Sequence, residues 1–311
     1  MLSNFLSKTL VFLILAVCHV FSCLPLRWAR GIGACLGSVV YACSARSRSM
    51  VAEHFPTQFS TANPSMTVHS LLRESGLGMA DMLWVWFASP ARVMRRVEAE
   101  NIEVIDALLR DKTPFLTVTL HTGCFELVGQ WMATRIPCTA LYKPPHKAYL
   151  KPLLEGKRAR HNLALAPANL MGVRRMLKAL KRGDTVALLP DQVPSAGDGV
   201  WVNWFGKPAY TMTLPAKLAR ATMALPVFTI ALRTKTGWKI SFTPKLLPEI
   251  LANTENTEKS SSQEKVDAAW MNAASEAIIA LAPEQYMWAY RRYKTPAGVL
   301  KPNTKPLDIL S

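Results

Sequence analysis

Two side chains suited to proton transfer lie close together in the segment His121-Thr-Gly-Cys-Phe-Glu126. A neutral imidazole can take a proton from an attacking hydroxyl near neutral pH. A carboxylate on its other ring nitrogen fixes the tautomer and stabilises the imidazolium that forms. Gly123 lets the backbone turn from a strand into a helix, which would bring the two side chains together. The pair predicts a general base, His121, oriented by Glu126; the alternative is that His121 caps a helix and Glu126 lies on the surface.

Cys124 offers a second chemistry in the same segment, because a thiolate beside His121 could act as the nucleophile of a hydrolase. A buried structural cysteine is the far commoner arrangement. No GxSxG elbow occurs in the chain, so a serine enzyme of the α/β-hydrolase type would lack its nucleophile. The six cysteines form no CxxC pair, which argues against a metal site and against a disulfide-stapled secreted fold.

Short β-rich runs and helical segments alternate around these residues. Pro114 to Leu120 predicts a buried strand ending at His121, and Thr185 to Leu189 predicts another ending just before Asp191. Polar residues at the C-terminal end of a buried strand are where α/β folds place their active sites. Further strands are expected at 139–142, 199–205, 226–232 and 238–243, and helices at 65–88, 124–133, 149–161, 171–182, 214–223 and 264–281.

This alternation predicts an α/β fold with a central, mostly parallel sheet flanked by helices. The expected organisation is an N-terminal membrane anchor with its basic flank, residues 1–48, followed by one catalytic domain, residues 49–311. Residues 51–64 look like a connector. Residues 253–263 are polar and rich in Ser, and they look like a surface loop.

The composition is apolar and basic. Hydrophobic residues make up 50% of the 311 residues and charged residues 19%, which excludes a disordered chain. The net charge of +16 attracts polyanions such as nucleic acid, anionic lipid headgroups, a phosphorylated glycolipid or an acidic carrier protein. We find neither zinc-finger spacing nor an RNP-like aromatic motif, so nucleic acid is not an expected partner.

The N-terminal segment from Thr9 to Leu24 is an uncharged apolar run. It is shorter than the roughly 20 residues that span a bilayer core comfortably, so it predicts a helix that either spans the membrane or lies in the interface. A cleaved signal peptide is the alternative. Gly31, Gly33 and Gly37 imitate a nucleotide-binding loop, but no strand precedes them, which argues against a dinucleotide site. By the positive-inside rule, four arginines place the main domain in the cytoplasm: Arg27, Arg30, Arg46 and Arg48.

Four sequence blocks follow one another in an order and spacing typical of a known family. They read His121-Thr-Gly-Cys-Phe-Glu126, Leu188-Leu-Pro-Asp-Gln192, Gly199-Val-Trp-Val-Asn-Trp-Phe-Gly-Lys-Pro-Ala209, and Pro283-Glu-Gln-Tyr-Met-Trp288 with Arg291-Arg-Tyr-Lys294. From about residue 70 to residue 297 the chain resembles the lysophospholipid acyltransferase superfamily, most closely the bacterial lipid A late acyltransferases. It departs from the family at Cys124-Phe125, where Asn-Trp is usual, and after the anchor, where only Phe55-Pro56 of the usual pattern remains.

The resemblance implies a glycerol-phosphate-acyltransferase-like fold at the cytoplasmic face of a bacterial inner membrane. It implies an acyl thioester donor, usually acyl carrier protein with acyl-CoA as the alternative, and a phosphorylated lipid A precursor as acceptor. The reaction expected is direct O-acyl transfer with no covalent acyl-enzyme, no metal and no bound organic cofactor. The alternatives are a glycerophospholipid or other lysolipid acyltransferase and, from a different class, a catalytically silent lipid-binding membrane protein.

Four further residues are expected to bind substrate. Arg158 and Arg160 would bind substrate phosphate or stabilise charge. Asp191 and Gln192 would bind or orient the acceptor, the alternative being that they only turn the chain. Two basic clusters could receive the carrier protein or a phosphate, or could be solvated faces: Arg174, Arg175, Lys178, Lys181 and Arg182, and Lys147, Lys151, Lys157, Arg158 and Arg160.

Overall fold

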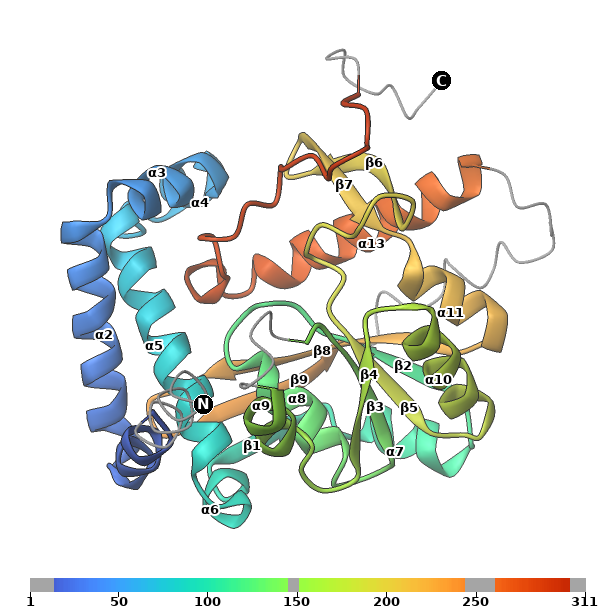
Figure 1. Ribbon diagram of the computed structural model, residues 1–311, viewed down its shortest axis with the longest axis horizontal. Coiled ribbons are helices and arrows are strands. Elements are labelled where there is room, and N and C mark those ends of the chain that lie inside the picture. Colours follow the sequence, from blue (N-terminus) through green and yellow to red (C-terminus); the bar gives the residue numbers. More distant parts are fainter. Residues whose placement is uncertain (1–13, 145–150, 244–260, 303–311) are drawn as a thin grey trace, which may run out of the picture.

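The computed structural model describes residues 14–144, 151–243 and 261–302, and at its centre lies a seven-stranded sheet (Figure 1). The strand order is β1-β9-β8-β2-β5-β3-β4. Five strands, β8, β2, β5, β3 and β4, run parallel to one another, while β9 is antiparallel to β8 and carries β1 at the edge. The bounds are β1 Val97–Glu100, β2 Phe115–Val118, β3 Cys138–Tyr142, β4 Leu163–Pro167, β5 Thr185–Leu188, β8 Leu225–Arg233 and β9 Trp238–Thr243.

Helices cover both faces of the sheet because its central strands are apolar on both sides. Every residue of β2 and of β5 is buried. Alternate strand residues point to opposite faces, so that Phe115 packs in one core cluster and Leu116 in the other. The first cluster includes side chains of α7 (Glu103–Arg110) and α8 (Phe125–Met132), and the second those of α10 (Leu170–Lys181), α11 (Leu214–Thr222) and α13 (Ser261–Ile279).

A separate antiparallel hairpin, β6 (Gly199–Trp204) with β7 (Lys207–Met212), packs against α13 (Figure 1). The chain after α13 passes through a short 3-10 turn, η3 (Pro283–Gln285), and returns to the carboxyl edge of the sheet. There Tyr286 forms an isolated antiparallel bridge with Thr122. The C-terminal block is therefore built into the sheet edge that carries His121.

Two N-terminal helices pack closely against each other beside the sheet, α2 (Leu26–Cys43) and α5 (Val68–Phe87) (Figure 1). Glycines make this approach possible, since a Cβ added to Gly33 would lie 2.5 Å from the carbonyl oxygen of Gly76, and one on Gly37 would lie 2.4 Å from that of Leu72. Gly33 and Gly37, two of the three glycines that imitate a nucleotide loop in the sequence, thus serve helix packing. Shorter helices lie nearby: α3 (Ala45–His54), α4 (Thr57–Ala62), α6 (Pro90–Met94) and α9 (Lys151–Arg158).

The α/β class and the mostly parallel central sheet are confirmed. The connector expected at 51–64 is wrong, because that stretch forms the end of α3 and all of α4. β1, β4, β7, α6 and α7 were not anticipated. In the part of the chain that can be described, we find no helix long and apolar enough to cross a membrane, although residues 14–23 are helical. Residues 9–13 of the expected anchor and 253–260 of the expected loop lie outside the described residues.

We predict that Gly76→Ala destabilises the protein by about 1–3 kcal/mol, the range typical of overpacking. The added Cβ would lie 2.1 Å from the carbonyl oxygen of Gly33. Gly78→Ala is the matched control in the same helix, because a Cβ there meets nothing within 4 Å. Thermal unfolding of both variants in detergent would test the prediction, and equal midpoints would contradict the close packing of α2 on α5.

Candidate functional site

His121 and Asp191 meet because their strands are parallel neighbours. β2 and β5 pair in register, with Val118 opposite Leu188, so the segments that follow them emerge at the same sheet edge. The backbone N–H of His121 donates to Oδ2 of Asp191 at 2.9 Å, and Nδ1 of His121 lies 2.8 Å from Oδ1 of Asp191. The Asp191 side chain is wholly buried, whereas 16% of the His121 side chain is exposed. One edge of the imidazole is thus anchored while the ring stays accessible.

The partner of His121 is therefore Asp191, and the expected pairing with Glu126 is wrong. The second ring nitrogen, Nε2, lies 3.0 Å from Nε2 of Gln192. In the neutral tautomer whose Nδ1–H donates to Asp191, Nε2 would accept from the Gln192 amide. Both residues that we expected to orient the acceptor thus contact the imidazole itself. The expected pairing failed because of strand order. β5 lies beside β2, so the carboxylate of Asp191 reaches His121, and residue spacing along the chain does not show this.

Glu126 lies in the first turn of α8 and pairs with Arg158 instead. The guanidinium donates through Nη2 to Oε1 at 2.6 Å and through Nε to Oε2 at 3.1 Å. Trp86 of α5 also donates its indole N–H to Oε2, at 3.1 Å, and the Arg158 guanidinium lies over the Trp86 ring at 5.0 Å. A bidentate pair of this kind holds the guanidinium in a fixed orientation.

Arg160 takes part in a different interaction from the phosphate contact that we expected. Its guanidinium donates to the carbonyl oxygens of Val85, Trp86 and Ala88, with 3.1 Å to Val85 and 2.8 Å to Ala88. These are the last carbonyls of α5 and its C-cap, which have no partner within the helix. Arg160 therefore caps α5 and helps to fix the position of Trp86.

The backbone of the His121 loop is held by β8 and by the C-terminal block. Gly123 has a φ of +55°, and a Cβ there would lie 2.2 Å from the carbonyl oxygen of Ala231. That oxygen accepts the N–H of Cys124 at 2.8 Å, and Gln285 accepts the N–H of Gly123 at 3.0 Å. The N–H of Met287 donates to the carbonyl of His121 at 2.9 Å. Glycine is required at 123 both for the turn and for the close approach.

Nearby charges keep Asp191 ionised. Burial alone would raise its pKa, but the attraction of His121, hydrogen bonds from His121 and the charge of Arg292 lower the pKa of this carboxyl below its usual range. Burial, and next the charge of Asp191, raises the pKa of the Tyr286 hydroxyl well above its ordinary value, so that it stays protonated and hydrogen-bonds to Asp191. The site therefore contains a stable anion directly behind the imidazole.

Cys124 is poorly suited to act as a nucleophile. The side chain is buried, and burial, followed by the charges of Asp81 and Glu126, raises the pKa of its thiol well above the ordinary value. A buried thiol kept protonated has little thiolate character. As for metal binding, within residues 14–144, 151–243 and 261–302 no three His, Cys, Asp or Glu side chains gather in a group that could hold an ion.

Trp86, Tyr286 and Arg292 were missed as members of the site. Arg292 is buried, donates to Thr211 Oγ1 and the Tyr210 carbonyl at 2.8 Å each, and leaves its Nε without an acceptor in the described part of the chain. The C-terminal block that carries the family resemblance contains Tyr286 and Arg292, but sequence reasoning assigned neither residue to the site. Trp86 lies in the helix expected at 65–88, but sequence reasoning did not assign it to the site.

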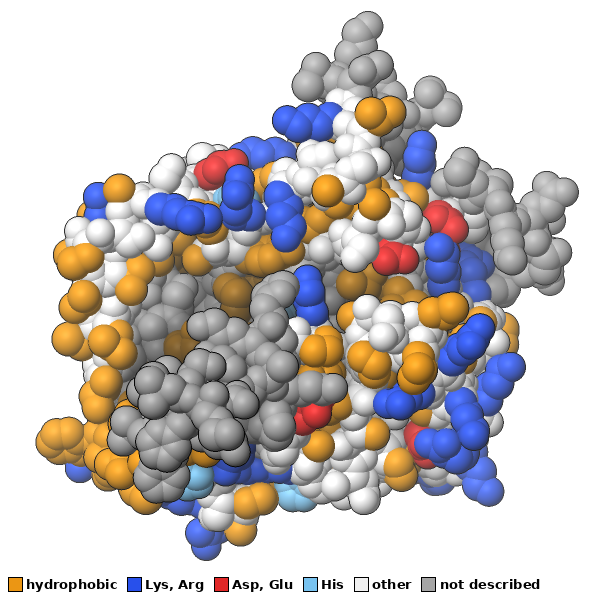
Figure 2. All heavy atoms as spheres, viewed as in Figure 1, with side chains coloured by type: hydrophobic (Ala, Val, Ile, Leu, Met, Phe, Trp, Pro, Cys, Tyr) orange, Lys and Arg blue, Asp and Glu red, His pale blue; other side chains and the backbone are white. Residues whose placement is uncertain are grey.

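One group of basic residues outside this site lies on α10. Figure 2 shows Lys and Arg side chains gathered at the lower right, over the position of α10 in Figure 1. On this helix Arg174, Arg175, Lys178 and Lys181 are exposed, beside the exposed apolar side chains of Leu170 and Met171. Lys147 of the other cluster lies outside the described residues, and nothing is described of the Lys151 side chain.

Comparison with known proteins identifies the family of the chain. A family described as bacterial lipid A biosynthesis acyltransferase matches residues 2–295. The chain is 30% identical over 228 residues to the lipid A biosynthesis lauroyltransferase of Escherichia coli K12, covering 72% of this chain and 71% of the relative. It is 26% identical over 249 residues to the palmitoleoyltransferase of the same organism, covering 78% and 76%, and 24% identical over 228 residues to a lipid A biosynthesis acyltransferase of Haemophilus influenzae, covering 72% and 69%. The resemblance read from the four sequence blocks is confirmed, and this chain belongs to the bacterial lipid A biosynthesis acyltransferase family.

Proposed function

We propose that this acyltransferase moves a fatty acyl group from a carrier-protein thioester to a hydroxyl of a phosphorylated lipid A precursor, with His121 as the general base and Asp191 as its orienting carboxylate. The observation that carries the mechanism is the geometry at His121. Asp191 occupies Nδ1 at 2.8 Å, so a proton from the substrate would go to Nε2, and 16% of the His121 side chain is exposed. Only one ring nitrogen is thus available to a substrate.

The proposed step is a direct transfer. The acceptor hydroxyl displaces the Gln192 amide and gives its proton to Nε2 of His121 while its oxygen attacks the thioester carbonyl carbon. The tetrahedral intermediate collapses, the C–S bond breaks, and the departing thiolate takes the proton back from the imidazolium. Asp191, buried and ionised, stabilises the imidazolium between these two events.

Arg158 is the group best placed to stabilise the developing negative charge. Glu126 and Trp86 fix the orientation of its guanidinium, and 23% of its side chain is exposed. α8 begins at Phe125, directly after the His121 loop, so the positive end of its dipole faces the same region. We therefore assign Glu126 to the positioning of Arg158 and not to proton transfer.

We predict that His121→Ala abolishes transfer and that Asp191→Asn lowers kcat by about 10²–10⁴-fold, the usual contribution of an oriented general base. Glu126→Gln should cost less, because it loosens Arg158 but leaves the imidazole anchored. Cys124→Ala is the control and should keep most of its activity. The measurement is steady-state transfer from acyl carrier protein thioester to a phosphorylated lipid A precursor, followed by mass spectrometry.

Two results would contradict this assignment. Wild-type turnover by folded His121→Ala would exclude the general-base mechanism. Complete loss in folded Cys124→Ala would support a covalent thioester intermediate instead. Transfer to lysophospholipid in place of the lipid A precursor would leave the mechanism intact but replace the acceptor.

The exposed side of α10 supports an acidic carrier protein as donor. Leu170 and Met171 lie directly after β4, at the same sheet edge as His121, and the basic residues follow along the helix. Exposed apolar side chains next to exposed basic side chains suit the docking of an acidic carrier protein, which must bring its thioester to that edge.

We expect higher salt to raise KM for the carrier-linked donor more than it lowers kcat, because exposed charges are screened over about 10 Å at about 0.1 M salt. Arg174→Glu with Arg175→Glu should produce the same effect at low salt. Arg110→Glu is the control, since 72% of this side chain is exposed and it belongs to α7 on the other face of the sheet. Salt-independent KM values would remove the electrostatic argument and favour a different donor.

The face of α2 that turns away from α5 supports association with the inner membrane at its cytoplasmic side. It exposes large apolar side chains at helical spacing, and Figure 2 shows orange along the edge of the molecule where α2 lies. These side chains are Trp28, Ile32, Leu36, Val39 and Val40, exposed by 41–61%. Exposed arginines at 27 and 46 flank the stripe, as expected for a helix that lies in the interface of an anionic bilayer.

We predict that Trp28→Ser with Leu36→Ser lowers the partition coefficient onto anionic phospholipid vesicles about tenfold or more, because each apolar side chain contributes roughly 1.5–3 kcal/mol when fully buried. Met223→Ser is the control, an apolar side chain 57% exposed at the end of α11. Co-sedimentation measures the bound fraction. Equal binding by both variants and the wild type would show that α2 does not enter the interface.

A further inference from the structure

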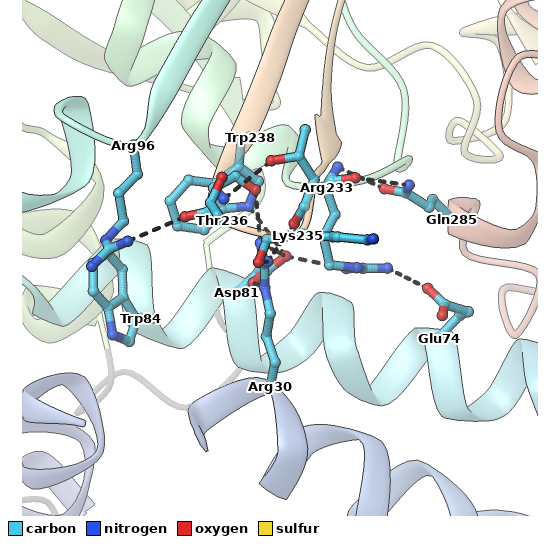
Figure 3. Close-up of polar contacts among 12 residues, drawn as sticks. Arg30, Glu74, Asp81, Trp84, Arg96, Arg233, Lys235, Thr236, Trp238 and Gln285 are labelled. Atoms are coloured by element: carbon cyan, nitrogen blue, oxygen red, sulfur yellow. Dashed lines mark hydrogen bonds and ion pairs between the residues drawn. The ribbon is translucent and has the colours of Figure 1, made fainter. Parts of the chain in front are cut away.

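A buried ionic cluster joins the two N-terminal helices to the sheet (Figure 3). At its centre is Asp81 of α5, whose side chain is wholly buried. Arg30 of α2 donates to Oδ1 at 2.7 Å, while Arg233 of β8 and the indole of Trp238 both donate to Oδ2 at 3.1 Å. Arg30 also donates to the carbonyls of Thr234 and Gly237, at 2.6 and 2.8 Å. A carboxylate so deeply buried is stable only with such partners.

Arg233 is the member of this cluster that reaches the active-site side. Its Nη2 donates to Glu74 Oε2 at 2.6 Å, so two carboxylates of α5 hold one guanidinium. Burial alone would lower its pKa, but the charges of Asp81 and Glu74 raise the pKa above the ordinary value. Arg233 is thus a fixed cation at the C-terminal end of β8.

The backbone of Arg233 is bound by the side chain of Gln285. The N–H of Arg233 donates to Oε1 at 2.8 Å, and Nε2 lies 3.4 Å from the carbonyl of Arg233. Figure 3 shows Gln285 facing Arg233 from the C-terminal segment while Glu74 and Asp81 approach the guanidinium from α5. These two contacts hold the side chain of Gln285 against the backbone of Arg233.

The carbonyl of Gln285 in turn accepts the N–H of Gly123, and Met287, two residues on, donates to the carbonyl of His121. The His121 loop is therefore hydrogen-bonded to a segment whose own position depends on Arg233. Neither Arg233 nor Gln285 contacts the imidazole of His121 or Asp191 directly. Neither residue takes part in the proposed reaction, and each can affect His121 only through backbone hydrogen bonds of the His121 loop.

We propose that Gln285 and Arg233 are positioning residues that align the His121 imidazole, with Asp81 and Glu74 of α5 fixing Arg233 from behind. This proposal rests on the proposed role of His121 as base. The carboxylate of Asp81 binds both Arg30 of α2 and Arg233 of β8. Efficient proton transfer would therefore depend on the packing of α2 and α5 against the sheet. Misplacement of a reacting group by about 1 Å can cost roughly 10²-fold in rate.

The test compares Gln285→Leu and Gln285→Glu with a control in the full-length protein. Leucine removes the acceptor for the Arg233 N–H, so kcat should fall about tenfold or more while KM stays within about twofold. Glutamate keeps an oxygen acceptor at that place and should restore most of kcat. The control is Arg220→Met, which breaks a partly buried ion pair between α11 and α13, with 2.8 and 2.7 Å contacts to Asp267, away from the His121 loop. It should lower Tm yet keep kcat when assayed well below the transition.

A second measurement does not depend on the substrate. The rate of His121 carbethoxylation by diethyl pyrocarbonate, followed by peptide mass spectrometry, reports how firmly Nε2 is held. Gln285→Leu should raise this rate severalfold, and Gln285→Glu and Arg220→Met should leave it unchanged. If Gln285→Leu keeps the wild-type carbethoxylation rate, or if kcat falls in Gln285→Leu and Arg220→Met alike in step with Tm, the positioning role is overturned. Failure of the proposed function would instead appear in the unaltered protein, as absence of acyl transfer, while the carbethoxylation result would still decide the positioning role.

Discussion

The double contact between Asp191 and His121 is the interaction on which the site depends. One carboxylate oxygen binds the backbone N–H and the other binds the ring, so a single buried side chain fixes both the loop and the imidazole. An anion in the interior is costly unless its surroundings compensate it. Arg292 and the hydroxyl of Tyr286 provide that compensation, and both belong to the C-terminal block. The C-terminal block is therefore needed to keep Asp191 ionised and His121 in position.

The structure of the sheet explains why distant blocks of sequence form one site. β2, β5 and β8 are parallel neighbours, so the residues after them reach one edge. His121 follows β2, and Asp191 and Gln192 follow β5. β8 provides Ala231, which bridges to Gly123 and whose carbonyl accepts the N–H of Cys124. β6, β7 and α13 hold Arg292 in place from the other side.

Sequence reasoning predicted the α/β class, the strands that end at His121 and Asp191, and most helices of the second half of the chain, because apolar periodicity and β-branched runs are local signals. It paired His121 with Glu126 because those residues are close along the chain. The carboxylate that binds the ring is seventy positions away, and only strand order could identify it. The contact of Arg160 with the end of α5 was not anticipated for a related reason, since nothing in the neighbouring sequence shows that the end of α5 lies beside it. β1 and β4 were missed because they lie at the two edges of the sheet, where exposed residues interrupt the apolar pattern. The division at residue 48 and the anchor itself remain predictions.

The Gln192 amide on Nε2 of His121 has a consequence for the enzyme between turnovers. A thioester in a site with an unoccupied base is vulnerable to water, which could be activated as readily as the acceptor hydroxyl. Here a water molecule must first compete with an amide that is already tethered 3.0 Å from the base, and it has no remote contacts with which to offset that loss. A large acceptor gains binding energy elsewhere and can displace the amide. Under the proposed mechanism, the side chain that occupies the resting base would favour acyl transfer over hydrolysis of the thioester.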